Sequence, residues 1–337
     1  LFLGSGKSIA LTGPSIILVY IGVGLIMFLL MRAIGEMMYS DPSQHTFINF
    51  ITRYLGRAWG KFAGWTYWIV LILTGMTEIT AVSTYFVTFF GTFGIDLNAW
   101  KWLIELCFLV ALTGINLIAV KVFGEAEFWF ASIKVFAIIA FIVIGLLAIF
   151  GAIPIAGHDS APLLGNFVAD GWFPSGIAPI FSTLLTVVFA FSGTELIGVT
   201  AGETRDPQTA VPKAIHTTLW RLALFFIGSI TVMCALIPWR KAGVGKSPFV
   251  LVFNGIGIPY AGDIMNFVVL TAVLSASNSG LYASTRMVWS MGNEGMIPRW
   301  FAKTNRRGVP MLALCAAMAG GLLALLSSVI AASTVYL

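Results

Sequence analysis

Long apolar runs dominate this sequence and constrain its fold more than any other feature. A helix needs about 20 mostly apolar residues to cross the hydrocarbon core of a bilayer. A short apolar segment, residues 1–12, is closed by Gly13-Pro14. Eight further runs are long enough to cross: residues 15–35, 60–90, 99–121, 126–150, 177–201, 215–238, 260–290 and 309–332. Because these runs are continuous and do not alternate with polar residues, they predict an all-α polytopic protein in a lipid bilayer.

The composition excludes several other classes of protein. Hydrophobic residues make up 58% of the chain and charged residues 10%, whereas a soluble domain has about 45–50% apolar and about 25% charged residues. The formal net charge of +5 does not indicate nucleic acid as a partner, because Lys and Arg lie in short loops and form no continuous patch. The sequence has no metal-ligand cluster and no phosphate-binding or nucleophile motif. We therefore expect no metal, no cofactor and no enzymatic activity.

The loops differ in basic charge, and this difference predicts the orientation in the membrane. Loops rich in Lys and Arg, such as residues 52–61 and 299–307, should face the cytoplasm. The long loop 151–176 contains acidic residues but no Lys or Arg, so it should face outward. Residues 43–60 have the pattern of a short amphipathic helix at the inner surface. Both ends of the chain lie in apolar sequence, and we expect it to be part of a longer protein.

Ionisable residues inside the predicted spans are the most informative about function. Glu78, Lys134 and Glu195 each stand alone in a long apolar stretch, where a charged side chain costs at least about 2.5–3.5 kcal/mol at mid-membrane. One interpretation is that these residues pair with one another and hold the helices together. The other is that they line a hydrated pathway and exchange protons. Glu105 lies about one turn inside its span, and we expect it to reach the membrane interface.

Weak helix formers interrupt one predicted span. Ser192-Gly193-Thr194 directly precede Glu195, and Gly costs about 1 kcal/mol in a helix interior. The glycine alone would indicate close packing of a neighbouring helix, but beside a carboxyl the pattern favours local unwinding. A broken helix offers backbone N–H and C=O groups at mid-membrane, which suit the two charges of a zwitterion. The segment Ser275 to Gly280, rich in hydroxyl groups, either joins helices or lines a cation site.

Several segments along the whole chain resemble one superfamily of transporters. They are Leu1 to Gly6, Ala10 to Ser15, Met31 to Met37, Phe123 to Phe130, Phe189 to Gly198, Ala201 to Pro207, Lys246 to Val250 and Ser277 to Gly280. On these segments the chain resembles the amino acid–polyamine–organocation superfamily and, within it, the bacterial amino acid transporter family. The run Gly193 to Gly198 is most similar to lysine and S-methylmethionine permeases. Earlier segments are more similar to D-alanine, D-serine and glycine permeases.

The resemblance implies a fold and a domain arrangement. Such permeases have the LeuT-type inverted five-helix repeat around a central site. Residues 1–337 would form a single transmembrane domain in the bacterial inner (cytoplasmic) membrane, running from the end of helix 1 through helix 9. The first repeat would take residues 1–150, the external loop residues 151–176, and the incomplete second repeat residues 177–337. The family's first-helix motif, which holds the substrate carboxylate, would precede Leu1.

The resemblance also implies a substrate site at the broken helix. The substrate-binding residues would be Phe189, Ala190, Phe191, Ser192, Gly193, Thr194 and, on an earlier span, Gly75. In this family the backbone at the break meets the ammonium group of the substrate. The ring of Phe191 would act as an aromatic gate.

A second set of residues would couple protons and gate the pathway. By resemblance this set is Lys134, Glu195, Glu78, Ser275 and Asn278. Lys134 matches a lysine that, in proton-driven relatives, takes the place of a sodium ion, with Ser275 and Asn278 near its ammonium. A lysine charge can do what a bound cation does, and protonation can switch it. Glu195 would link protonation to gating.

These features together predict a secondary active transporter. The expected activity is proton-coupled uptake of an amino acid across the cytoplasmic membrane by alternating access. An exchanger of two amino acids with no net proton movement is the alternative within the same class. A polytopic membrane enzyme or receptor is the alternative from another class, and neither a catalytic pair in the spans nor a large extramembrane domain supports it. We favour a neutral or methylated small amino acid as substrate; the oligomeric state stays open.

Overall fold

The computed structural model describes residues 5–41, 44, 46–118, 120–155, 161–197, 207–242, 248–258 and 260–330. Within these ranges the regular secondary structure is helical, and no strand is present. Seven helical segments are long and apolar enough to cross a membrane: Ser5–Ser40, Arg57–Gly91, Asn98–Leu117, Glu127–Ile149, Ala178–Leu196, Gln208–Leu236 and Gly262–Asn293. A shorter apolar helix follows at Met311–Leu326. The predicted all-α polytopic fold is confirmed.

The helices follow the predicted runs closely at their centres. Those of the first half are α1 (Ser5–Thr12), α2 (Ile16–Ser40), α3 (Phe47–Leu55), α4 (Arg57–Gly91), α5 (Lys101–Ile118) and α6 (Val120–Ile149). Those of the second half are α7 (Gly165–Val168), α8 (Ala178–Ala190), α10 (Pro207–Leu222), α11 (Ser229–Leu236), α12 (Pro248–Ile256), α13 (Ala261–Asn293) and α14 (Met311–Ile330). A π-helical stretch, Ala223–Gly228, joins α10 to α11.

One predicted boundary is confirmed and another is wrong. Helix α1 ends at Thr12, and a short 3₁₀ turn, Gly13–Ser15, with a Gly13 φ of 66°, separates it from α2, as the Gly13-Pro14 pair predicts. Proline is tolerated in the first turn of a helix, where its missing N–H has no partner to lose. The amphipathic helix expected at residues 43–60 is shorter and covers Phe47–Leu55. It ends at Gly56, whose φ of 92° only glycine adopts without strain, and α4 begins at the next residue.

The described helices fall into two compact units, and the first has one large apolar core. It contains Leu1–Ala33, Val135–Thr194 and Pro212–Val268. Its core is centred on the ring of Phe141, which lies 4.4 Å from that of Phe249 and 5.6 Å from that of Phe253, centroid to centroid. Here α1 packs against α8, and α11 packs against α7 and α12.

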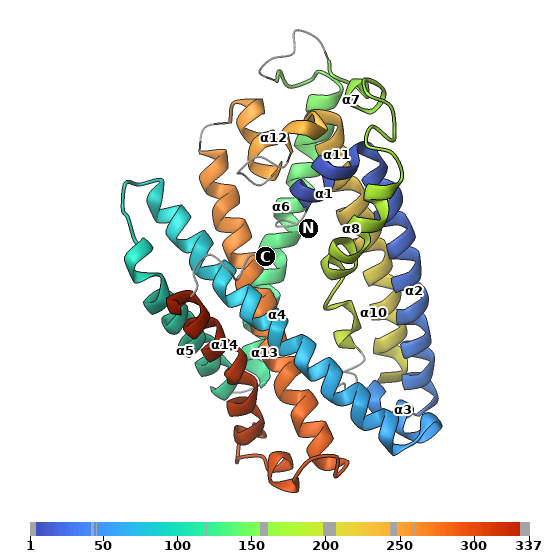
Figure 1. The fold of residues 1–337 in the computed structure, drawn as a ribbon, viewed down its shortest axis with the longest axis vertical. Coiled ribbons are helices and arrows are strands. Elements are labelled where there is room, and N and C mark those ends of the chain that lie inside the picture. The colour runs from blue at the N-terminus through green and yellow to red at the C-terminus, as the bar shows by residue number, and fades with distance from the viewer. Residues whose placement is uncertain are drawn as a thin grey trace. The chain divides into compact units, whose positions relative to one another are not determined.

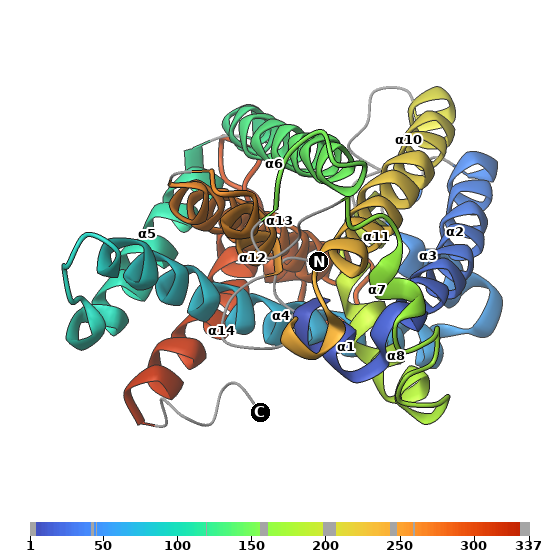
Figure 2. The same ribbon diagram turned by 90° about the horizontal axis from the view of Figure 1, so that it is seen from above.

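The second unit is built around α4. It contains Ile34–Lys134, Glu195–Val211 and Val269–Leu337. Helices α3, α5 and α14 all pack against α4, and α5 also packs against α14 (Figures 1 and 2). Glycine allows several of these approaches: for example, a methyl group on Gly320 of α14 would lie 2.9 Å from the carbonyl oxygen of Ile72 on α4. This unit holds the ionisable residues of most interest.

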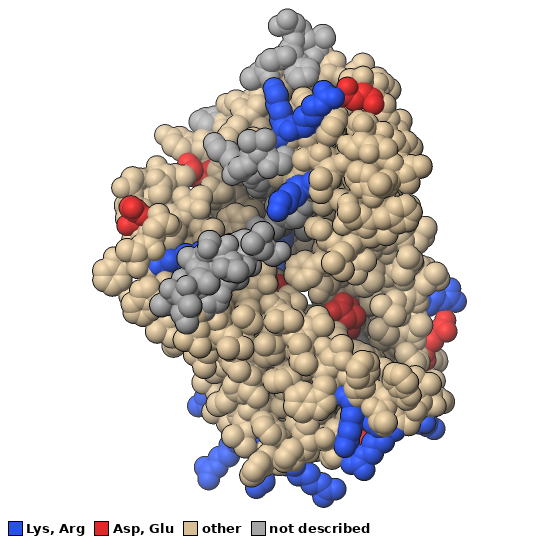
Figure 3. Space-filling view, viewed as in Figure 1, with Lys and Arg blue, Asp and Glu red and all other residues tan. Residues whose placement is uncertain are grey.

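Large apolar side chains are exposed along the spanning helices. Phe136 on α6 is 76% exposed and Leu185 on α8 is 80% exposed. A face with few charged side chains is visible in Figure 3. Contiguous apolar surface of this kind is rare on monomeric soluble proteins and is expected where lipid surrounds the helices.

Candidate functional site

Lys134 lies at the centre of a polar cluster in the second unit. Its Nζ donates a hydrogen bond to Oγ of Ser275 on α13, at 2.6 Å. The Ser275 side chain is fully buried and in turn donates to Oε1 of Glu127. Glu127 lies seven residues before Lys134 on α6, so two helical turns place both side chains on one face. The Nζ of Lys134 is 3.9 Å from Oε1 of Glu127.

Glu78 on α4 faces the same cluster. Its carboxyl interacts electrostatically with both Lys134 and Glu127. Its Oε2 atom is buried and has no hydrogen-bond partner among the residues that the structure describes. Gly280 on α13 borders that oxygen: a methyl group there would lie 3.6 Å from it, in ordinary van der Waals contact. The cluster therefore contains one amine and two carboxyls.

An asparagine pair extends the cluster along α13. Asn278 is fully buried, and its Oδ1 accepts a hydrogen bond of 3.0 Å from Nδ2 of Asn116 on α5. The Nδ2 atom of Asn278 is buried without a partner in the described part of the chain. Sequence reasoning did not identify Asn116 or Glu127 as site residues. The isolated amide of Asn116 in an apolar run could have indicated a site residue. The seven-residue spacing of Glu127 from Lys134 could have indicated that the two share one face of a helix.

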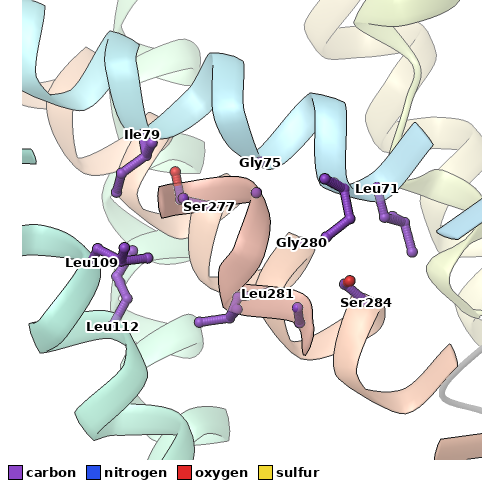
Figure 4. A pocket seen from close by; sticks show the side chains of 13 residues that line it. Leu71, Gly75, Ile79, Leu109, Leu112, Ser277, Gly280, Leu281 and Ser284 are labelled. Carbon is purple, nitrogen blue, oxygen red and sulfur yellow. The ribbon is translucent and has the colours of Figure 1, made fainter. Parts of the chain in front are cut away.

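A small cavity lies in the second unit, between α4, α5, α13 and α14. Its volume is about 30 Å³, which is enough for one water molecule. The Oγ atoms of two lining residues, Ser277 and Ser284, are buried and have no partner within the described ranges. Figure 4 shows these two serines on α13 with Gly75 on α4. Gly75 is the residue for which the sequence predicts a position facing the substrate pocket.

The helix break predicted at Ser192-Gly193-Thr194 is present in the first unit. Helix α8 ends at Ala190, and a short 3₁₀ helix begins at Thr194. Between them the backbone N–H of Ser192 bonds to the carbonyl of Phe189 at 3.0 Å, a three-residue step in place of the four-residue step of an α-helix. Gly193 has a φ of 96°, a conformation that stops the helix and that other residues rarely adopt.

The side chains at the break differ in their surroundings. Phe189 is exposed, whereas Phe191 is buried. The ring of Phe191 stacks on that of Phe226 with centroids 4.6 Å apart, and the ring of Tyr20 lies 6.0 Å away. Gly24 on α2 borders the same ring. Phe191 is thus part of an aromatic cluster formed by α2, the break and the π-helical stretch.

Glu195 lies just after the break and belongs to the second unit. The hydroxyl of Tyr67 on α4 donates a hydrogen bond of 3.2 Å to its Oε1. Glu195 is half-buried, so its carboxyl is neither deeply enclosed nor fully in solvent. The hydrogen bond fixes one oxygen of a carboxyl that the sequence predicts to act in gating.

Glu105 does not reach the membrane interface, and that expectation is wrong. Its side chain is fully buried, and the Oγ of Ser83 on α4 lies 2.8 Å from its Oε1. Helix α5 packs closely on α4 at this level, so the carboxyl meets a serine in place of water. A single sequence shows the distance of a residue from the end of its span but not which face of the helix it occupies.

The predicted site residues form two groups. Gly75, Glu78, Lys134, Ser275, Asn278 and Glu195 lie in the second unit, and Phe189, Ala190, Phe191, Ser192, Gly193 and Thr194 lie in the first. Among the described residues, no group of three His, Cys, Asp or Glu side chains could hold a metal ion.

Membrane-length helices with an amine and carboxyls among them form a polytopic membrane protein in the part of the chain that the structure describes. The chain belongs to the amino acid permease family, whose match covers residues 1–337. It is an amino acid transporter and a multi-pass protein of the bacterial inner membrane. This confirms the family resemblance read from the sequence.

Similar proteins cover nearly the whole chain. The putative histidine permease of Bacillus subtilis is 45% identical over 100% of this chain and 70% of its own length. The L-asparagine permease of Escherichia coli is 41% identical over 94% of this chain and 63% of that permease. The D-serine/D-alanine/glycine transporter of Escherichia coli is 41% identical over 96% of this chain and 68% of that transporter.

Proposed function

We propose that this protein takes up an amino acid together with a proton, by alternating access. The observation that carries the proposal is the Lys134 ammonium, enclosed in a membrane helix bundle with two carboxyls, Glu78 and Glu127. When all three groups ionise, the cluster has one negative charge in excess. One additional proton makes it neutral, and a neutral cluster is far less costly to keep away from water. Such a cluster can therefore bind one proton per transport cycle.

The broken helix supports an amino acid as the carried substrate. The C-terminal end of α8, at Phe189 and Ala190, carries the negative end of the helix dipole and suits an ammonium group. The turn through Ser192, Gly193 and Thr194 supplies backbone polar groups that a continuous helix would keep to itself. In this account Phe191 is the gate, and its ring leaves the stack with Phe226 when the pathway opens.

The division of the helices supports an inverted repeat. In the first half of the chain α2 begins in the first unit, whereas α4 and α5 belong to the second. In the second half α8 and α11 belong to the first unit, whereas most of α13 and all of α14 belong to the second. The first unit followed by the second thus recurs in both halves, with α6 from Val135 returning to the first unit between them, as two repeats, residues 1–150 and 177–337, would produce. Relative motion of two such units is a common basis of alternating access.

We infer a small neutral amino acid as substrate. Two of the relatives are named for asparagine and for D-serine, D-alanine and glycine, all with neutral side chains. Because one relative is named a putative histidine permease, a test panel should include amino acids with side chains up to the size of histidine.

Replacing Lys134 by Met tests the proton coupling. The full chain is reconstituted in vesicles with an acidic exterior, and accumulation of a panel of labelled amino acids is measured. Lys134→Met removes the amine and keeps the apolar stem, so proton-driven accumulation should be lost. Lys61→Met, which removes an exposed lysine on α4, is the matched control and should accumulate substrate normally. Intact accumulation by Lys134→Met would contradict the proposal.

A further inference from the structure

Glu127 is the one carboxyl of the polar cluster to which neither its position in the sequence nor the family resemblance gives a role. It lies near the beginning of α6, and its side chain is 26% exposed, as is that of Lys134. Its Oε1 atom receives the hydroxyl hydrogen of Ser275, and its Oε2 atom is buried without a partner among the described residues. A carboxylate in such a position holds unused capacity for a proton.

The three groups form a continuous hydrogen-bond chain. Lys134 donates to Ser275, and Ser275 donates to Glu127, so the serine hydroxyl both accepts and donates. The amine and the carboxyl are also 3.9 Å apart, close enough for strong attraction in a partly buried setting. Among the described residues, the carboxyl of Glu78 on α4 also interacts with the pair, and α13 contributes the hydroxyl of Ser275.

We propose that Glu127 is the proton acceptor for Lys134, with Ser275 as the relay between them. This rests on the proposed proton coupling. One N–H bond of the Lys134 ammonium breaks as its proton passes to Oγ of Ser275, and Ser275 passes its own hydrogen to Oε1 of Glu127. The products are a neutral amine, an unchanged serine and a neutral carboxylic acid. Partial exposure of Glu127 then lets the proton leave to water, and no side chain needs to cross the cluster.

The test separates proton-driven accumulation from amino acid exchange, which needs no net proton transfer. Glu127→Gln keeps the size of the side chain and an oxygen for Ser275, but it cannot accept the proton. We expect the initial rate of uptake under a pH gradient to fall by on the order of a hundredfold, the lower end of what a positioned acid–base group contributes to a rate. Exchange of labelled for unlabelled amino acid should be unchanged. Ser275→Ala should give the same pattern, because it interrupts the relay and keeps both end groups.

Controls make each outcome decisive. Glu125→Gln alters an exposed carboxyl two residues away on α6 and should behave as the unmodified protein. Glu127→Asp, which retains a carboxyl, should recover part of the accumulation. If Glu127→Gln accumulates normally while Lys134→Met does not, Glu127 has no such role and the proposed coupling stands. If both accumulate normally, both proposals are wrong. Loss of exchange as well as accumulation in Glu127→Gln would show a structural role and overturn the relay.

Discussion

At the residue scale, the chain has ionisable side chains inside its membrane-spanning helices, where an ionised group is costly unless it is paired or hydrated. A charge near the middle of a membrane costs several kcal/mol, and the second unit encloses Lys134 with Glu78 and Glu127. Mutual attraction and the Ser275 hydroxyl offset part of this cost. The buried Oε2 atom of Glu78 has no hydrogen-bond partner among the described residues. Adding a proton to the cluster would lower the cost of keeping this carboxyl away from water.

Glu195 provides a prediction at this scale. Glu195→Gln keeps an oxygen that accepts the hydrogen bond from Tyr67, so the fold around it should be retained. The amide cannot gain or lose a proton, so we expect the pH profile of uptake to become flatter while thermal stability stays the same. Uptake is measured in vesicles between acidic and neutral pH. A pH profile identical to that of the unmodified protein would exclude a gating role for this carboxyl.

Part of the site could be predicted from the sequence, because isolation in an apolar run is itself a signal. Glu78, Lys134 and Glu195 were found in this way. Glu127 was not, since it has Glu125 beside it and lies near a helix end, where charge is ordinary. Its partner Ser275 lies far away in the sequence, and only the packing of α13 on the cluster brings the two together.

At the element scale, glycines set how closely the helices of the second unit approach. Helix α14 packs on α4 at Gly320, where an added methyl group would meet the backbone oxygen and the side chain of Ile72 at 2.9 Å. The backbone of Ile72 cannot move aside as the end of a flexible side chain can. The same helix brings Gly321 against Leu109 of α5. Small residues at such contacts are the usual means of close packing between membrane helices.

Gly320→Ala should therefore destabilise the protein. Overpacking of a close contact costs about 1–3 kcal/mol, and we expect a lower thermal unfolding temperature in detergent. Gly114→Ala on α5 is the matched control, since a methyl group there meets nothing within 4 Å. Its better helix propensity should leave stability unchanged or raise it by about 0.5–1 kcal/mol. Equal stability of the two variants would contradict the packing described for α14.

The spanning helices could be predicted because lipid requires each to have about 20 mostly apolar residues. The positions at which helices end outside the membrane could not be predicted in this way. Helix α10 begins at Pro207, eight residues before the predicted start, because its first turns are polar and hydropathy follows only the apolar part. The nine residues of α12 are too few for a spanning run, so no length rule identifies them. The break after α8 was predictable because weak helix formers and a carboxyl coincide there.

At the scale of the whole molecule, the family establishes what is transported as a class, and the energy source is our proposal. Membership of the amino acid permease family over residues 1–337 establishes amino acid transport. Proton coupling rests on the cluster around Lys134, and alternating access rests on the recurrence of helices in two units. Composition and apolar runs are enough to predict a membrane protein. The proposed proton coupling depends on contacts between segments that are distant in the sequence, which only the folded structure shows.

Uptake driven by an imposed pH gradient is the most direct test of proton coupling in this protein. The protein is reconstituted in vesicles that contain no amino acid, and labelled neutral amino acids are supplied outside at acidic pH. The account predicts accumulation above the external concentration, which stops when a protonophore dissipates the gradient. Uptake that ignores the gradient and rises only when unlabelled amino acid is loaded inside would contradict it, and would identify an exchanger.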